Sequence, residues 1–168
     1  MTLSGVSSGA RIFVDSTIFI YHFTGASADC RTFLTRCEAG DIKATTSVVV
    51  MAEVAHRLMM IEAVARGLLP RGNVARKLRT RPDVVKGLDT YQQQVERIPL
   101  MGVTVLSLDV KVLLHSEGIR KKYGLLVNDS LVTASATLAG LRSLATADSD
   151  FRRVTELETF EPEDLKSG

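Results

Sequence analysis

Arg11-Ile12-Phe13-Val14-Asp15 is a short apolar run that ends on a carboxylate. β-Branched and aromatic residues in a run of this length favour a buried strand. In an open α/β sheet, ligands bind beyond the carboxyl ends of the strands, so a strand that ends in Asp15 places this acid where a site is expected. Strand and helix patterns alternate through most of the remaining chain, which predicts an α/β fold with a central parallel sheet and helices on both faces.

The length of 168 residues and the hydrophobic fraction of 45% predict a single domain with one closed core. Residues 1–10 are uncharged and rich in Ser and Gly, so we expect a flexible leader. We expect the domain itself over residues 11–155 and an acidic tail over 156–168. Within the domain, residues 62–100 have a helical pattern of their own, which predicts an extra helical insertion made of a pair of helices with basic outer faces.

Several classes of protein are excluded or disfavoured by what the sequence lacks. No apolar run approaches the length of a membrane span and residues 1–10 lack a signal-peptide core, so we expect a cytoplasmic protein without membrane attachment. Cys30 and Cys37 lie seven residues apart on one face of a predicted helix, as buried free thiols do in a reducing compartment. Glycine-rich nucleotide-binding motifs are absent, which disfavours nucleotide-cofactor enzymes.

Acidic residues stand at or near the boundaries of four predicted elements. Asp15 follows a strand, Glu53 lies early in a helix that begins after Ser47, Asp129 stands at a helix start, and Asp148 and Asp150 follow a strand over residues 141–146. Carboxylates that face one crevice raise one another's pKa, because like charges at short range repel. A hard divalent cation such as Mg²⁺ or Mn²⁺ relieves that repulsion, since it prefers oxygen ligands.

Each acid also has a structural interpretation. Asp129 fits the N-cap of the helix that follows it. Asp148 and Asp150 lie in a Thr-x-Asp-x-Asp run and fit turn-forming positions equally well. Glu53 is harder to interpret as a plain surface residue, because it is closely bracketed by apolar residues.

Four blocks of sequence together resemble the PIN-domain ribonucleases, and among them the VapC-type toxins of toxin–antitoxin pairs. The blocks are residues 12–21 (IFVDSTIFIY), 46–53 (TSVVVMAE), 124–136 (GLLVNDSLVTASA) and 146–151 (TADSDF). Their order and spacing cover most of the chain from Arg11 to Phe151. Family members often have Asn two places after the first Asp, where this chain has Thr17.

The resemblance implies a single PIN-like domain that acts as a metal-dependent endoribonuclease and leaves 3′-hydroxyl and 5′-phosphate ends. It implies that the catalytic acids are Asp15, Glu53, Asp129 and Asp148. Asp15, Asp129 and Asp148, with Asp150 as an additional candidate, would hold Mg²⁺ or Mn²⁺, and Glu53 would orient or deprotonate the attacking water. It also implies a cognate antitoxin protein and a homodimer. The alternative is a non-cleaving PIN-like module that binds RNA or protein.

Binding of an RNA substrate needs cations near the acids, and the chain concentrates them in one stretch. Residues 66–86 carry seven Lys and Arg side chains against the single acid Asp83, although the formal net charge of the whole chain is only +2. We expect phosphate contacts from Arg76, Lys77, Arg79 and Arg81. A solvated helix face is the alternative, and Arg120, Lys121 and Lys122 form a second basic cluster.

Overall fold

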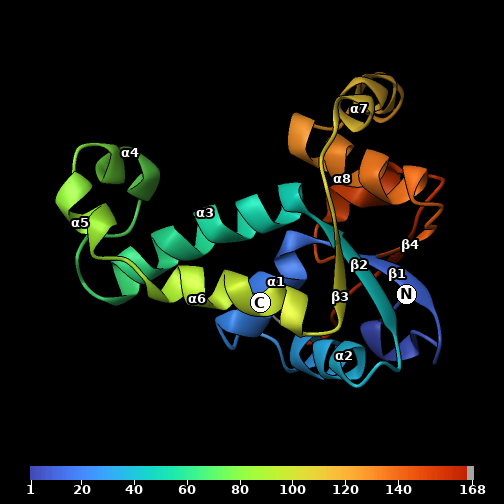
Figure 1. Ribbon diagram of the computed structural model, residues 1–168, viewed down its shortest axis with the longest axis horizontal. Coiled ribbons are helices and arrows are strands. Elements are labelled where there is room, and N and C mark those ends of the chain that lie inside the picture. The colour runs from blue at the N-terminus through green and yellow to red at the C-terminus, as the bar shows by residue number, and fades with distance from the viewer. Residues whose placement is uncertain (166–168) are drawn as a thin grey trace.

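The computed structural model describes residues 1–165 (Figure 1). Within them, five strands form one sheet in the order β3-β2-β1-β4-β5, and all neighbouring strands are parallel. In the middle of the sheet, Phe13 lies opposite Thr45 on one side and Leu144 on the other. The predicted α/β class with a central parallel sheet is therefore confirmed. The strands are β1 Arg11–Val14, β2 Lys43–Ser47, β3 Val103–Leu106, β4 Ser143–Ala145 and β5 Glu158–Phe160.

The helices fall into two groups that flank the sheet. Figure 1 shows α7 and α8 together on one side, and α1, α2, α3 and α6 gathered on the other. The α-helices are α1 Ser16–Phe23, α2 Ala28–Glu38, α3 Val48–Ala65, α4 Val74–Arg79, α5 Pro82–Lys86, α6 Thr90–Arg97, α7 Val110–Tyr123 and α8 Val127–Leu138. Three short 3₁₀ turns complete the part of the chain that the structure describes: η1 Leu3–Gly5, η2 Ile98–Leu100 and η3 Ser149–Arg153.

The core is built from the central strand and the helices against it. Ile12, Phe13 and Val14 are completely buried, as expected of a strand covered on both faces. Cys30 and Cys37 are buried free thiols on α2, and burial raises their pKa to about 11 and about 12. Their predicted role in packing is therefore confirmed.

The insertion contains three helices where the sequence pattern predicts a pair. Pro82 does not interrupt a helix but occupies the first position of α5, where its missing N–H costs nothing. α4 and α5 lie at the outer end of α3, away from the sheet, and α6 returns alongside α3 (Figure 1). A small second core forms there around Ala63, Leu69, Leu78, Val84 and Leu88.

A buried carboxylate holds the returning helix in place. Glu62 on α3 accepts hydrogen bonds from the backbone nitrogens of Asp89 and Tyr91, at 3.2 and 2.8 Å, so that it satisfies N–H groups at the start of α6. Arg66 donates to the Glu62 carboxylate at 3.0 Å and to the carbonyl of Gly87 at 2.7 Å. Burial alone would raise the pKa of Glu62, but the hydrogen bonds from Tyr91, Arg66 and Asp89 outweigh it and lower the pKa.

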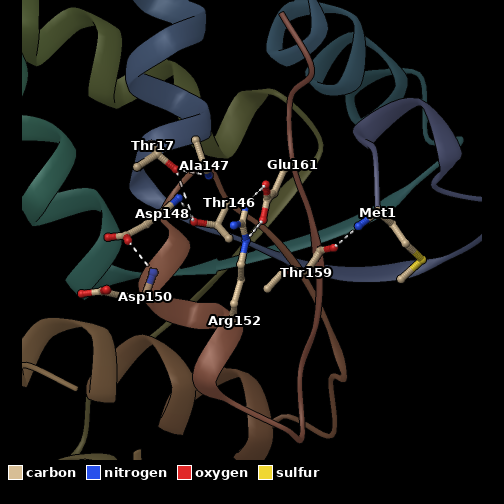
Figure 2. Close-up of polar contacts among 9 residues, drawn as sticks. All are labelled: Met1, Thr17, Thr146, Ala147, Asp148, Asp150, Arg152, Thr159 and Glu161. Atoms are coloured by element: carbon tan, nitrogen blue, oxygen red, sulfur yellow. Dashed lines mark hydrogen bonds and ion pairs between the residues drawn. The ribbon is translucent and has the colours of Figure 1, made fainter. Parts of the chain in front are cut away.

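The two ends of the chain differ from expectation. Residues 1–10 are not a flexible leader, because Leu3 and Val6 are buried and the Leu3 nitrogen donates to the Glu161 carbonyl at 3.0 Å. Figure 2 shows the Met1 amino group donating to the carbonyl of Thr159, at 2.9 Å. The boundary at residue 155 is also wrong, since β5 lies beyond it and adds an edge strand to the sheet.

The acidic residues after β5 are engaged with the domain. Figure 2 shows Glu161 in a bidentate ion pair with Arg152, whose guanidinium nitrogens lie 2.7 and 2.6 Å from the two carboxylate oxygens. Glu161 is only 7% exposed. Asp164 accepts from the Ser27 hydroxyl at 2.7 Å and from the Ala28 nitrogen at 2.6 Å, at the start of α2. These residues are therefore part of the fold. The last three residues of the predicted acidic tail, 166–168, lie outside the described residues. No helix within residues 1–165 combines the length and the apolar character that a membrane crossing requires.

Candidate active site

Asp15 stands at the carboxyl end of the central strand and is 3% exposed. Its backbone nitrogen donates to the Ala145 carbonyl at 3.0 Å, which continues the pairing of β1 with β4 by one residue. Its side chain is the N-cap of α1 and accepts from the Thr17 nitrogen, so Asp15 rather than Ser16 or Thr17 caps this helix. One carboxylate oxygen is therefore used to fix the residue.

Two threonine hydroxyls hold that same oxygen. Thr17 Oγ1 and Thr146 Oγ1 both donate to Asp15 Oδ2, at 2.7 and 2.9 Å. Because each hydroxyl has one proton, and both protons go to Asp15, the hydroxyls act as acceptors toward the loop after β4. Thr17 Oγ1 accepts from the Ala147 nitrogen at 2.9 Å, and Thr146 Oγ1 accepts from the Asp148 nitrogen at 3.0 Å.

This network ties the first acid to the last one. Figure 2 shows Thr17 and Thr146 beside the backbone of Ala147 and Asp148, which connects the end of β4 to η3. Asp15 Oδ2 accepts all the hydrogen bonds that residues 1–165 donate to this carboxylate, from the Thr17 nitrogen and from the two hydroxyls. Oδ1 accepts none of them and is available to a ligand. Sequence reasoning noted Thr17 only as a departure from the usual Asn and did not assign Thr146 a role.

Glu53 reaches the site from α3, which follows β2, the other neighbour of β1. Ser47 is the N-cap of α3, and its hydroxyl accepts from the Val50 nitrogen at 3.4 Å. Partial burial raises the pKa of Glu53, and the charges of Asp15 and Asp148 add to the increase, while Ser16 and Arg57 oppose it. Glu53 thus lies within electrostatic reach of both strand-end acids.

Asp129 is in the first turn of α8, which begins at Val127, earlier than the sequence pattern indicates. The N-cap position belongs to Leu126 and has no side-chain capping bond, so the N-cap interpretation of Asp129 is wrong. Partial burial raises the pKa of Asp129 to about 6, with further increases from the charges of Asp148, Asp15, Glu53 and Asp150. Asp129 is therefore within electrostatic reach of four other acids of the cluster.

Asp148 and Asp150 differ in their availability. Asp148 caps η3, since its Oδ1 accepts from the Asp150 nitrogen at 2.8 Å, and its other oxygen makes no hydrogen bond to residues 1–165. Asp150 forms an ion pair with Arg153. Figure 2 shows the carboxylates of Asp148 and Asp150 on the same side of this turn. Asp148 therefore forms the turn, as one interpretation of the sequence predicts, but it uses only Oδ1 for this purpose, and the second oxygen is available to a ligand.

The donor chemistry of the cluster fits a hard divalent cation. All of its side chains offer carboxylate oxygen, which Mg²⁺ and Mn²⁺ prefer. Within residues 1–165, no three acidic, histidine or cysteine side chains already stand as a group close enough to hold one ion. Asp15 and Asp148 raise the pKa of Glu53, and these two acids and Glu53 raise the pKa of Asp129, so the acids share one region and repel one another, as an acidic site does before a cation neutralises it.

The residues predicted to bind RNA lie away from these acids. Arg76, Lys77 and Arg79 are on α4 and Arg81 precedes α5, and Figure 1 places both helices at the outer end of α3. At about 1.5 Å per residue, the 18 residues of α3 span roughly 27 Å.

Two of the four side chains already have partners. Lys77 donates to the carbonyls of Pro70 and Arg71, both at 3.2 Å. Arg81 forms a bidentate ion pair with Asp83. Arg76 and Arg79 are exposed and make no side-chain hydrogen bond or ion pair within residues 1–165.

Comparison with known proteins agrees with this arrangement. The PIN domain family model matches residues 12–157. The chain is 26% identical to Ribonuclease VapC2 of Methanocaldococcus jannaschii over 151 residues, which is 90% of this chain and 93% of that protein.

Two solved structures share the fold. One is VapBC2 of Rickettsia felis bound to a DNA fragment from its promoter, with a TM-score of 0.58, 14% identity, and coverage of 91% of this chain and 99% of that one. The other is VapC20 of Mycobacterium tuberculosis, described as a toxin that cleaves the sarcin–ricin loop, with a TM-score of 0.55, 16% identity, and coverage of 86% and 95%.

Proposed function

The chain belongs to the PIN-domain family, and from this premise we propose that it is a metal-dependent endoribonuclease, the toxin of a toxin–antitoxin pair. The observation that carries the proposal is the convergence of Asp15, Glu53, Asp129 and Asp148 at the carboxyl edge of the sheet, with the pKa of Asp129 raised to about 6 by burial and its acidic neighbours. The names of the similar proteins, a VapC ribonuclease and a loop-cleaving VapC toxin, support RNA as the substrate.

We propose that Asp15, Asp129 and Asp148 hold Mg²⁺ or Mn²⁺, with Asp150 as a further candidate ligand. When bound, such an ion lowers the pKa of water and neutralises charge on the scissile phosphate. Asp15 is the most rigid of the three acids, because its Oδ2 accepts from Thr17 and Thr146 and only Oδ1 remains for a ligand. Asp150 is paired with Arg153 through Oδ1, so it would contribute through Oδ2.

Glu53 is the residue suited to act on the attacking water. Its raised pKa makes it a stronger base than an ordinary carboxylate, and its position within electrostatic reach of Asp15 and Asp148 places it beside the other acids. Proton transfer to Glu53 would also relieve the repulsion that raises its pKa. Attack of this water on phosphorus with cleavage of the P–O3′ bond would leave a 5′-phosphate on one product and, once the departing oxygen is protonated, a 3′-hydroxyl on the other.

We propose two protein partners for this chain: a cognate antitoxin and a second copy of the chain. A cognate antitoxin is supported by the Rickettsia felis VapBC2 complex, which has the same fold. A homodimer is supported by an apolar stripe on α7, where Val110 and Leu114 are both 69% exposed and lie one helical turn apart. An apolar stripe is self-complementary, as a two-fold contact requires. We propose a cytoplasmic location, where RNA substrates are present.

Calorimetric titration with Mn²⁺ separates this proposal from a non-cleaving PIN-like module. We expect the unmodified chain to bind Mn²⁺ and the Asp129→Asn variant to bind it at least ten-fold more weakly. The exposed Glu96→Gln variant, on α6, is the matched control and should bind Mn²⁺ like the unmodified chain. A chain that binds no Mn²⁺, or binds it equally with Asn at position 129, would favour the non-cleaving module.

A further inference from the structure

The acidic cluster needs a route for a polyanion, and one groove leads away from it. We propose that the groove lined by Arg57 and Arg71, between α3 and the start of α4, binds the phosphodiester backbone of the RNA strand where it leaves the acids. This inference rests on the proposed function; Arg71 belongs to the basic stretch 66–86, whereas Arg57 lies outside it.

The groove is continuous with the site along one helix. Arg57 follows Glu53 by four residues on α3, so it lies on the same face, about 6 Å further along the axis. Arg57 is close enough for its charge to act on Glu53. The groove has a volume of about 610 Å³, and its lining includes Arg57, Met60, Ile61, Val64, Arg71 and Val74.

Both arginines are available to a ligand. Arg57 and Arg71 are exposed, and neither guanidinium makes a hydrogen bond or ion pair with any other residue in 1–165. Other cations nearby are already used: Arg66 pairs with Glu62, and Arg81 with Asp83. The groove therefore presents two exposed guanidinium groups without a hydrogen bond or ion pair within residues 1–165, of which Arg57 is also within electrostatic reach of Glu53, and this arrangement suits an anion.

The edge that carries Arg71 is held in place by a neighbour. Lys77 on α4 donates to the carbonyls of Pro70 and Arg71, both at 3.2 Å, so it fixes the backbone on which the Arg71 side chain stands. Lys77 is therefore a positioning residue for the groove. Its ammonium group is already occupied by these two carbonyls.

The floor of the groove indicates how a strand would lie in it. Met60, Ile61, Val64 and Val74 are aliphatic, and Ile61 is 39% exposed. Riboses and base faces can pack on such a surface while the arginines contact phosphates, but no base edge is read. We therefore expect binding here to be tolerant of sequence.

The test uses a labelled, unstructured RNA of twelve nucleotides and measures its affinity by fluorescence anisotropy at several salt concentrations. The Asp129→Asn background keeps the RNA intact. In that background, Arg57→Gln with Arg71→Gln should lower the affinity at least ten-fold at low salt. It should also reduce the slope of log affinity against log salt by about 1.4, since each lost contact with single-stranded RNA accounts for roughly 0.7.

The matched control neutralises two exposed cations at the opposite edge of the sheet, Lys43→Gln with Arg142→Gln. Lys43 begins β2 and Arg142 directly precedes β4, so both lie at the amino ends of the strands. This control should leave both affinity and slope unchanged. An unchanged slope in the Arg57 and Arg71 variant, with its circular dichroism spectrum preserved, would overturn the inference. The inference would also be overturned if the Arg57 and Arg71 variant kept its RNA affinity but lost binding to an acidic antitoxin segment. The groove would then be a protein-docking site.

Cleavage assays without the Asp129 substitution distinguish the two levels of the proposal. If the groove carries the strand, Arg57→Gln with Arg71→Gln should raise KM more than it lowers kcat. If the unmodified chain cuts no RNA with Mg²⁺ or Mn²⁺, the proposed function fails, whereas the anisotropy result still decides whether the groove binds RNA.

Discussion

Thr146 Oγ1 donates a 2.9 Å hydrogen bond to Asp15 Oδ2 and so joins the carboxyl ends of β4 and β1. The residues are 131 positions apart in the chain, and both are buried. Because Thr146 also accepts from the Asp148 nitrogen, one hydroxyl orients two acids of the site at once.

Replacing Thr146 by Val should impair both stability and cleavage, since Val keeps the shape and removes the hydroxyl. A hydrogen bond to a charged group contributes about 1.5 to 3 kcal/mol, so we expect the free energy of unfolding to fall by about that amount. Cleavage should fall at least ten-fold because Asp15 and Asp148 lose their common partner. Urea unfolding and RNA cleavage measure the two effects. Thr146→Ser restores the hydroxyl and should recover most of both, and a Val variant that equals the Ser variant would refute this role.

The raised pKa of Asp129 predicts a pH-dependent cost of keeping this acid ionised. The folded pKa of about 6 lies above the ordinary aspartate pKa of 3.8, so between these values the folded chain binds more protons than the unfolded chain, and stability decreases as pH rises. Asp129→Asn removes this dependence. In EDTA, the variant should gain stability over the unmodified chain between about pH 4 and pH 6, and keep a gain of about 1 to 2 kcal/mol at pH 7.5 after allowance for solvent screening. A difference in the free energy of unfolding between the variant and the unmodified chain that stays the same at every pH would contradict the prediction.

The cations on the insertion should separate into two kinds. Arg76→Gln with Arg79→Gln removes charges that have no partner in the described residues, so RNA affinity should fall while the melting temperature stays the same. Lys77→Gln with Arg81→Gln breaks contacts with Pro70, Arg71 and Asp83, so this pair should lower the melting temperature, unlike the first pair. Thermal melts and anisotropy on both pairs decide the matter. The opposite pattern would mean that Lys77 and Arg81 serve RNA and not the fold.

The apolar stripe on α7 should govern self-association. Leu114→Glu puts a charge on a side chain that is 69% exposed, so it should convert a homodimer to a monomer without unfolding the chain. Size-exclusion chromatography with light scattering measures the mass. Leu100→Glu is the control, since Leu100 is 77% exposed but lies in η2, outside the stripe. A monomeric unmodified chain at micromolar concentration, or a dimeric Leu114→Glu variant, would contradict this assignment.

The sequence was most informative where a local pattern and a tertiary role coincide. The run 11–15 predicts both the central strand and the place of Asp15, because a buried strand needs apolar residues and its last residue necessarily lies at the carboxyl edge. The predicted helix that carries Cys30 and Cys37 is also present as α2, and Gly40, which adopts a left-handed φ of 75°, lies just beyond its end.

Other features depend on contacts between distant residues and could not be predicted. β5 contains only three residues, and its pairing with β4 rather than any apolar run makes it a strand. The start of α8 was missed because Leu126 and Val127, although apolar, are exposed on the first turn of a helix. The occupation of Lys77 by two carbonyls follows from the loop before α4 and leaves no local signal. The role of Thr146 requires β4 to lie beside β1.

The most direct test of the central claim measures cleavage of a 5′-labelled single-stranded RNA by the purified chain and by its Asp15→Asn variant, with Mg²⁺ or Mn²⁺ and with EDTA. The account predicts products with 5′-phosphate and 3′-hydroxyl ends from the unmodified chain, dependence on the added ion, and at least a thousand-fold lower rate when Asn replaces Asp15. The reason is that Asn keeps the size of Asp15 but removes the charge of the one acid that the structure fixes rigidly. Cleavage that continues at the normal rate in the Asp15→Asn variant, or in EDTA, would contradict the account.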